Sequence, residues 1–271
     1  MIVDAHQHFW NLETGSYPWL TPEAGVLYRT YAPADLAPEL AAAGVDGTVL
    51  VQAADSIEET ESMLALADAN DFILGVVGWI PLTDPRAAAE AIERYGRHPK
   101  FVGVRHLIHE EPDPDWVVQD GVLESLGLLA EAGLTFDVVS LLPRHLEHVV
   151  TLAVRHPGLR IVIDHLSKPR IKDRAWEPWA AQLAAAAACP NVYAKVSGLV
   201  TEADHESWTV EDLRPYVEHA LAVFGPGRLM FGSDWPVALL AADYQRVHRA
   251  ARELVGADEV FSQTAARFYG F

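Results

Sequence analysis

The sequence predicts a single α/β domain over residues 1–271, built as a distorted (β/α)8, or TIM, barrel with long loops over its C-terminal mouth. Eight short, β-rich apolar runs alternate with helical segments, and the chain length of 271 residues is close to that of one such barrel. Connections of helix length require parallel pairing of the strands that they join. The eight expected strands are residues 2–8, 47–52, 74–80, 100–106, 134–139, 160–165, 191–197 and 228–233.

End signals support the expected helices between these strands. Asp84 is a suitable N-cap with Pro85 at the first helical position, and this helix is expected to end near Gly96. Thr209 begins a capping-box pattern, and Pro215 is expected to interrupt the helix that follows soon after it begins.

Composition limits the possible partners. The net charge is −18 with no local Lys/Arg cluster, so we expect a small-molecule substrate and neither nucleic acid nor a membrane surface. The longest apolar run, residues 179–189, is too short to cross a bilayer, and no signal-type segment precedes the first strand. The lone Cys189 fits a reducing, cytoplasmic compartment. The oligomeric state stays open, with a homodimer among the alternatives.

The first expected strand contains the most informative motif, Asp4-Ala-His6-Gln-His8. Side chains alternate along a strand, so the two imidazoles share one face about 7 Å apart along the strand, a spacing suited to gripping one metal ion or one substrate oxygen. First and last strands of a closed barrel are neighbours, which brings Asp234 beside them. Asp4 lies one layer deeper, either orienting a histidine ring or serving as a buried hydrogen-bonding group.

Polar residues recur at the carboxyl ends of the expected strands, where barrel enzymes place their sites. Apolar residues precede each of them, so burial is expected to perturb their pKa values. A single histidine of this kind more often has a structural role, and Lys195 and Lys168 each have an alternative role in a structural ion pair. The residues are His6, His8, Gln52, His106, Asp137, His165, Lys195, Ser197 and Asp234.

Two connections are too long and too aromatic to be simple turns. Residues 9–32 contain Trp10, and residues 107–120 contain Trp116 together with several carboxylates. Both follow strands, so they are expected to lie over the mouth and to contact substrate. Packing of Trp10 against the barrel rim is an equally good interpretation.

Taken together, the motifs resemble those of the amidohydrolase superfamily, and more narrowly its group of sugar lactonases, which includes hydrolases of L-fuconolactone and L-rhamnonolactone. The resemblance covers nearly the whole chain. The motifs are the first-strand Asp-x-His-x-His, Val104-Arg105-His106, Ile163-Asp164-His165-Leu-Ser-Lys168-Pro169, Lys195-Val-Ser197-Gly198-Leu199 and Gly232-Ser233-Asp234-Trp235-Pro236.

The resemblance implies that Asp234 transfers protons and that His6 and His8 bind a divalent metal ion or polarise the substrate directly. Superfamily members with a firmly bound metal usually carry a histidine after the fifth strand and a lysine or glutamate on the fourth. This chain has Asp137 and His106 at those places. A single Zn²⁺ or Mn²⁺ ion on His6, His8 and Asp234 and a metal-free site therefore both remain open.

Hydrolysis of a lactone requires an activated water, a polarised carbonyl and a proton for the departing ring oxygen. Asp234 is the expected base, and His165 and His106 are the expected hydrogen-bonding partners of the oxyanion. Gln52, Lys195 and the two long loops, with Trp10 and Trp116, would then hold the sugar hydroxyls. No nucleophilic serine is expected, because neither Ser197 nor Ser233 has a base beside it in the sequence.

Two other functions compete with lactone hydrolysis. A metal-dependent decarboxylase of a small unsaturated or aromatic acid has the same histidines and aspartate, but it needs a cation for the substrate carboxylate. Alternation predicts that Arg105, the main candidate, faces the helices and not the site. A barrel that binds a sugar or a metal without turnover is the non-enzymatic alternative.

Overall fold

The computed structural model describes residues 1–271, which form one barrel of eight parallel strands in the order β1 to β8. The eight expected strands and their alternation with helices are thus confirmed. The strands are β1 Val3–Gln7, β2 Gly47–Val51, β3 Ile73–Gly78, β4 Phe101–His106, β5 Thr135–Val138, β6 Arg160–Ile163, β7 Val192–Val196 and β8 Leu229–Phe231.

The barrel closes between its first and last strands just beyond the end of β8. The amide of Asp234 donates to the carbonyl of His6 at 2.8 Å, and the amide of His8 donates to the carbonyl of Trp235 at 2.7 Å. β8 is only three residues long, so this seam depends on the turn that follows it. His6 and His8 therefore lie on one side of this seam, and Asp234 lies on the other.

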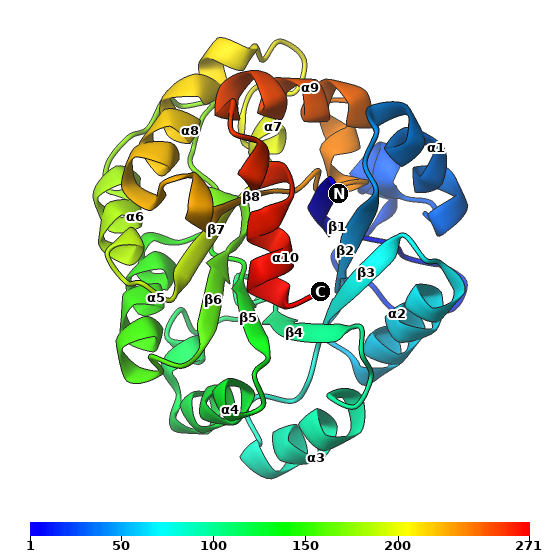
Figure 1. Cartoon of the computed structure of the whole chain (residues 1–271), viewed down its shortest axis with the longest axis vertical. Coiled ribbons are helices and arrows are strands. Elements are labelled where there is room, and N and C mark those ends of the chain that lie inside the picture. Colours follow the sequence, from blue (N-terminus) through cyan, green and yellow to red (C-terminus); the bar gives the residue numbers. More distant parts are fainter.

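Helices surround the strands as an outer ring (Figure 1). Their bounds are α1 Pro33–Ala43, α2 Ile57–Ala69, α3 Pro85–Tyr95, α4 Asp120–Glu131, α5 Pro143–Arg155, α6 Trp179–Ala187, α7 Leu199–Glu202, α8 Val210–Phe224, α9 Tyr244–Val255 and α10 Gln263–Tyr269. None of these helices is long and apolar enough to span a membrane.

The predicted helix ends can be compared with the structure at α3 and α8. The carboxylate of Asp84 accepts from the amides of the first turn of α3, and the helix ends before Gly96, as expected. The capping box at Thr209 is also present. The expected interruption at Pro215 is wrong, because α8 continues to Phe224. Proline there removes only the hydrogen bond to the carbonyl of Glu211, which lies in the exposed first turn where water can solvate it.

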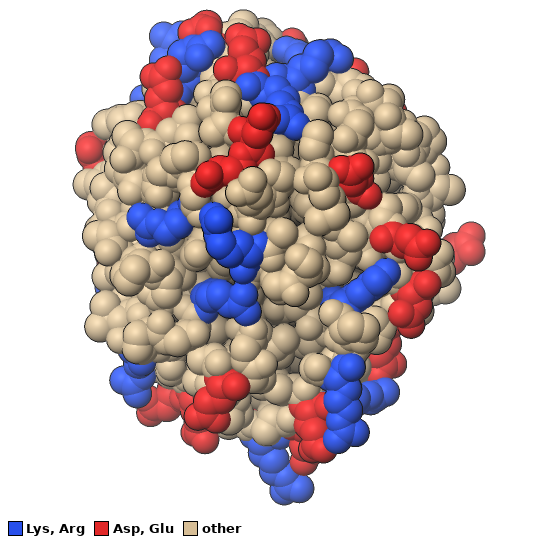
Figure 2. Space-filling view, in the orientation of Figure 1, with Lys and Arg blue, Asp and Glu red and all other residues tan.

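The amino-terminal end of the barrel is closed by α10, which lies across the middle of the ring in Figure 1. Phe268 is fully buried there, and its carbonyl accepts from the guanidinium of Arg160 at the start of β6. The hydroxyl of Tyr269 reaches Asp137 inside the barrel at 2.7 Å. On this face, Lys and Arg form small groups separated by uncharged surface, with Asp and Glu mostly toward the edge (Figure 2).

Candidate active site

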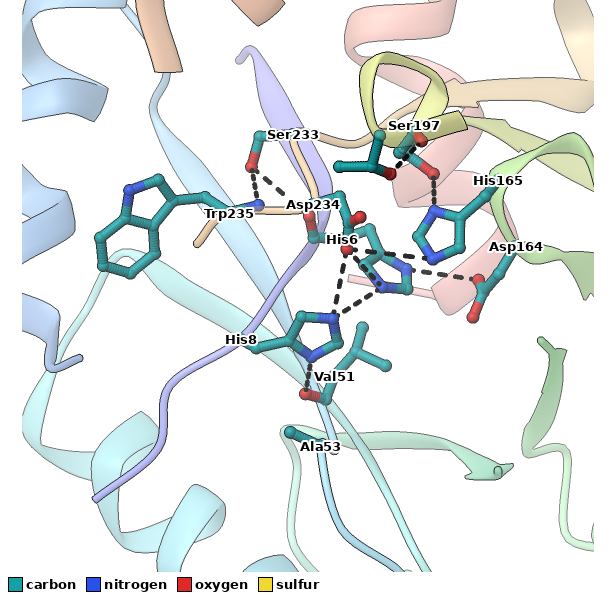
Figure 3. A network of polar contacts seen from close by, with 12 residues as sticks. His6, His8, Val51, Ala53, Asp164, His165, Ser197, Ser233, Asp234 and Trp235 are labelled. Atoms are coloured by element: carbon teal, nitrogen blue, oxygen red, sulfur yellow. Dashed lines mark hydrogen bonds and ion pairs between the residues drawn. The ribbon is translucent and has the colours of Figure 1, made fainter. Parts of the chain in front are cut away.

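His6, in β1, and His8, directly after it, project into the opposite, carboxyl-terminal end of the barrel, where their Nε2 atoms lie 3.1 Å apart (Figure 3). Both side chains are almost fully buried. The Nδ1 atom of His8 lies 2.7 Å from the carbonyl oxygen of Val51, which can only accept, so Nδ1 carries the proton of the neutral ring. The Nε2 atom of His8 consequently presents a lone pair to the site.

Asp234 completes this group from the turn after β8, with Oδ1 3.4 Å from His8 Nε2 and 3.7 Å from His6 Nε2. Its backbone is held in the left-handed region at φ 58°, a conformation that costs energy for a non-glycine residue. Asp4 stabilises this turn, because its Oδ1 accepts from the amides of Ser233 at 2.8 Å and His6 at 3.1 Å. Of the two roles that the sequence allowed, Asp4 therefore serves as a buried hydrogen-bonding group and does not orient a histidine ring.

His165 reaches the site from an unusual segment directly after β6. Residues 165–168 all have positive φ angles, between 48° and 62°, so they form a left-handed turn. The indole of Trp179 donates to the carbonyl of Leu166 at 2.6 Å and helps to hold the turn. This turn directs His165 Nε2 toward Asp234 Oδ1, at 3.9 Å. Backbone strain of this kind persists where the surroundings enforce it, often at functional sites.

The other ring nitrogen of His165 lies 2.9 Å from the hydroxyl of Ser197. The tertiary structure thus supplies the neighbouring base that the sequence around Ser197 does not contain. Ser197 does not line the cavity in front of His165, so its hydroxyl orients the ring and is not placed to attack a substrate. Gly198 follows it at φ 61°, and a methyl group there would lie 2.6 Å from His165 Nδ1.

Burial and the neighbouring groups set the charges of these residues. Burial raises the pKa of Asp234, but the nearby imidazole of His165 and the hydrogen bond with His8 outweigh it and hold the pKa well below its ordinary value. Burial lowers the pKa of His8, and it lowers the pKa of His165 to about 4 against the opposing effect of Asp234. Near neutral pH the site therefore holds an ionised carboxylate beside neutral imidazoles.

Arg105 faces the site, and the expectation that it faces the helices is wrong. Its guanidinium donates to Asp164 at 3.0 Å and lies 3.5 Å from His6 Nε2. In the barrel register Arg105 pairs with Asp137, and both point inward. The prediction assumed that His106 faces the site. Because side chains alternate along a strand, its neighbour Arg105 faces the site instead when His106 does not.

Asp164 is central to the site, although the sequence pattern singled out only its neighbour His165 as a candidate. Its carboxylate is fully buried between Arg105, Lys195 and His6, with Oδ1 3.3 Å from His6 Nδ1. Its position directly before His165 at a strand end was the available signal.

The residues expected to hold the sugar hydroxyls from inside the barrel are engaged elsewhere. Lys195 is fully buried, with Nζ 2.6 Å from Asp137 and 3.1 Å from Asp164, and it does not reach the cavity. This is the structural ion pair that the sequence left as the alternative. Gln52 is also fully buried, where its amide donates to Asp55 and its Oε1 accepts from Arg105. Neither side chain has a free group for a substrate.

His106, Trp10 and Trp116 also lie outside the lining of the cavity, where their predicted roles would place them. His106 has both nitrogens occupied, by Glu111 at 2.7 Å and by the indole of Trp79 at 2.9 Å, and it stacks on Trp116 at 3.8 Å. It thereby holds the 107–120 loop and does not line the cavity. Trp10 is buried and donates its indole N–H to a backbone carbonyl, so it packs the 9–32 loop onto the rim.

The two loops nevertheless cover the site, as expected. A cavity of about 170 Å³ opens between them and the histidines. Trp19 contributes from the first loop, and His109 and Glu110 contribute from the second. The cavity is lined by His8, Trp19, Ala53, Arg105, Leu107, His109, Glu110, Val139, His165, Lys168, Asp234 and Val237.

The donor set of His6, His8 and Asp234 fits a single divalent metal ion. The three facing atoms, two imidazole nitrogens and one carboxylate oxygen, lie 3.1, 3.4 and 3.7 Å from one another. Tetrahedral bonds of about 2.0–2.1 Å to one zinc-like ion would separate its ligands by about 3.3 Å. Three protein ligands leave a position open for water, as is typical of catalytic sites.

A parallel eight-stranded barrel with histidines and an aspartate at the carboxyl ends of its first, sixth and eighth strands defines a hydrolase-type barrel with a candidate metal centre. The chain belongs to the amidohydrolase family, whose model matches residues 3–271.

Two curated relatives share this family and most of their length with the chain. An L-fucono-1,5-lactonase of Burkholderia ambifaria is 40% identical over 89% of this chain and 82% of its own length. An L-fucono-1,5-lactonase of Burkholderia multivorans is 38% identical over 98% and 95%. A crystal structure of an amidohydrolase from Burkholderia multivorans with bound zinc superposes with a TM-score of 0.93, at 36% identity over 100% and 99%.

A decarboxylase is among the solved structures with the same fold, but it is much less similar. A 2,6-dihydroxybenzoate decarboxylase has a TM-score of 0.68 and 16% identity, with 100% of this chain and 99% of that chain covered. A likeness at that identity shows the shared barrel alone.

Proposed function

We propose that this protein hydrolyses the lactone ring of a sugar acid, with a 1,5-aldonolactone such as L-fucono-1,5-lactone as its substrate. The observation that carries the proposal is the convergence of Asp234, His8 and His165 on a cavity covered by two loops. The two Burkholderia relatives described above are both named for this reaction, which supports the choice of substrate.

Asp234 is the proton carrier in this proposal. As its carboxylate accepts a proton from water, the water oxygen attacks the carbonyl carbon of the lactone, and the bond from that carbon to the ring oxygen then breaks. Asp234 returns the proton to the departing ring oxygen, and the product is the open-chain hydroxy acid. An aspartate whose pKa is held low stays ionised at neutral pH and is ready to accept.

His165 supports the developing negative charge on the carbonyl oxygen. When the Ser197 hydroxyl donates to Nδ1, the proton of the neutral ring resides on Nε2, which faces Asp234 and the cavity. A fixed N–H donor at this place stabilises an oxyanion without reorganisation during the reaction.

His6, His8 and Asp234 are the proposed ligands of one divalent ion, with Zn²⁺ or Mn²⁺ as candidates. Such an ion would supply Lewis acidity, polarising the carbonyl and making water more acidic.

The wall of the cavity favours a neutral polyol over a carboxylate substrate. Arg105 is the cation that lines the cavity beside the histidines, and its charge is compensated by Asp164 at 3.0 Å. Lys168 at the rim is paired with Glu202 at 3.3 Å. A decarboxylase or a dicarboxylate lactonase needs an uncompensated cation for its substrate, so these pairs argue against both functions.

The test is proton release from a panel of L- and D-aldono-1,4- and 1,5-lactones, followed with a pH indicator in the presence and absence of a chelator. We expect fastest hydrolysis of L-fucono-1,5-lactone and of stereochemically related lactones. Loss of activity with chelator, and its return with Zn²⁺ or Mn²⁺, would support the ion. No enzymatic hydrolysis of any lactone by the zinc- or manganese-loaded protein would refute the proposal.

The cytoplasmic location stays a prediction, and the oligomeric state stays open with a homodimer among the alternatives.

A further inference from the structure

His6 has two complete and mutually exclusive sets of hydrogen-bonding neighbours. One set consists of the Lys195 ammonium, 3.1 Å from Nδ1, and the bare Nε2 of His8, 3.1 Å from His6 Nε2. The other consists of Asp164 Oδ1, 3.3 Å from Nδ1, and the Arg105 guanidinium, 3.5 Å from Nε2. The first set requires the ring proton on Nε2, and the second requires it on Nδ1.

The first set has the shorter contacts. An ammonium group can only donate, so a proton on Nδ1 of His6 would face an N–H of Lys195 at 3.1 Å. A bare Nε2 would in turn face the bare Nε2 of His8 at the same distance. With the proton on Nε2, a continuous chain of hydrogen bonds leads from Lys195 through His6 and His8 to the carbonyl of Val51.

A metal ion requires the ring proton position of the second set, on Nδ1, and would itself take the Nε2 lone pair that faces Arg105. To act as a ligand, His6 Nε2 must offer a lone pair, so the ring proton has to reside on Nδ1. Asp164 Oδ1 is ready to accept it, because this fully buried oxygen makes no hydrogen bond although it lies near Lys195. Lys195 would then lose its acceptor on His6.

We propose that Lys195 is a positioning residue that holds His6 in the Nε2-protonated form, and that binding of a divalent ion moves this proton to Nδ1, where Asp164 accepts the hydrogen bond. The exchange is balanced, since one proton leaves Nε2, one arrives at Nδ1 through solvent, and the ring stays neutral. Lys195 therefore weakens metal binding and stabilises the histidine pair without metal. The inference rests on the proposed ion site, but it is independent of lactone hydrolysis.

The direct test is the tautomer of His6 in solution. In metal-free protein labelled with ¹⁵N-histidine, long-range proton–nitrogen spectra distinguish protonated from bare ring nitrogens, and the His6 signals are those missing from a His6→Gln variant. We expect the proton on Nε2 of His6 before addition of Zn²⁺ and on Nδ1 afterwards. A proton on Nδ1 in the metal-free protein, or a doubly protonated ring, overturns the proposal.

The second test is the affinity for Zn²⁺, measured by competition with a chromophoric chelator. The variant is Lys195→Met combined with Asp137→Asn, which removes the donor to His6 and keeps the buried charge balanced. We expect Zn²⁺ to bind about 10- to 100-fold more tightly, the equivalent of one charged hydrogen bond. Equal affinity for the variant and the unaltered protein, including no binding by either, overturns the role of Lys195.

Tyr269→Phe is the matched control. It removes the other donor to the same oxygen of Asp137, at 2.7 Å, and does not contact His6. We expect its Zn²⁺ affinity and its His6 tautomer to equal those of the unaltered protein. If Tyr269→Phe tightened binding as much as the double variant, a general loosening of the buried charge cluster would replace the proposal. The spectra of the unaltered protein decide the tautomer even where a variant folds poorly.

Discussion

The two ends of the barrel differ in the side chains that the same eight strands place there. At the amino-terminal end, α10 places Phe268 and Tyr269 over the strand starts, and apolar side chains fill the interior. At the carboxyl-terminal end, ionisable side chains converge beside a cavity, and residues 165–168 and Asp234 adopt left-handed conformations. One end is closed by packing, whereas the other accumulates buried charge and backbone strain.

This difference indicates where stability and chemistry reside in the molecule. Packing of large apolar side chains stabilises the fold, whereas left-handed backbone destabilises it, as does a buried carboxylate with a raised pKa such as Glu59 near neutral pH. Substitutions at the mouth should therefore reduce turnover with little loss of stability. Substitutions at the closed end should do the reverse.

The largest expected effect is that of Asp234→Asn at the mouth. An amide cannot accept the proton, so we expect kcat to fall at least about 1,000-fold while the free energy of unfolding stays within about 1 kcal/mol. Lactone hydrolysis and urea unfolding measure the two quantities. Asp113→Asn, on the exposed part of a mouth loop outside the cavity, is the control and should keep full turnover. Wild-type turnover in folded Asp234→Asn would remove Asp234 from the mechanism.

Phe268→Ala should produce the opposite result at the closed end. The side chain is fully buried, so its truncation is expected to lower the free energy of unfolding by about 3–5 kcal/mol. At temperatures where the variant is folded, kcat should be unchanged. Urea unfolding tests the stability, and Phe271→Ala, at a partly exposed position, should give a clearly smaller loss. A strong decrease in kcat of folded Phe268→Ala would show that the two ends are coupled.

The pH dependence of the free energy of unfolding should show how much the buried charge of Glu59 near the mouth destabilises the fold. Burial raises the pKa of Glu59 to about 7, above the 4.5 of an ordinary glutamate. Since the folded protein binds this proton more tightly, the stabilisation is complete below pH 4.5 and is lost as the pH rises through about 7. The loss should reach about 3 kcal/mol. Glu59→Gln should remove this component, which urea unfolding at several pH values can measure. Parallel pH profiles for both proteins would contradict the prediction.

The smallest expected effect comes from Gly198→Ala compared with Gly256→Ala. Both glycines have φ near 60°, at 61° and 63°, so both substitutions should cost about 1–2 kcal/mol of stability. Only at Gly198 would the added methyl group lie 2.6 Å from His165 Nδ1, while nothing lies within 4 Å at Gly256. We expect about a tenfold decrease in kcat for Gly198→Ala alone. Equal kcat values for the two variants would argue that the position of His165 does not limit the reaction.

The sequence predicted the barrel and its eight strands correctly, and His6, His8, His165 and Asp234, expected at strand ends, lie together in the structure. These predictions needed only the alternation of side chains along a strand and the rule that parallel strands end on one side of a barrel. The same alternation gave the wrong face for Arg105, because the prediction placed its neighbour His106 on the face that lines the site, and Arg105 takes that place.

The roles of the interior polar residues depended on contacts between distant strands. Lys195 meets Asp137 and Asp164, and His106 meets Trp79 and Glu111, each pair across a different connection. These partners occupy the hydrogen-bond donors and acceptors of Lys195 and His106, which the sequence alone did not pair with any particular residue. For this reason Lys195 and Gln52, predicted to hold substrate, and His106, predicted to support the oxyanion, lie outside the lining of the cavity.

By itself the sequence determined the class of fold and which strands deliver the chemistry, because periodicity and residue type are local properties of the chain. Only the tertiary structure decided which of these polar residues face the cavity and which neutralise each other inside the barrel. Pairing of buried charges is a property of distances across the barrel. The proton on His6, shared between two sets of neighbours from four strands and turns, is the sharpest example.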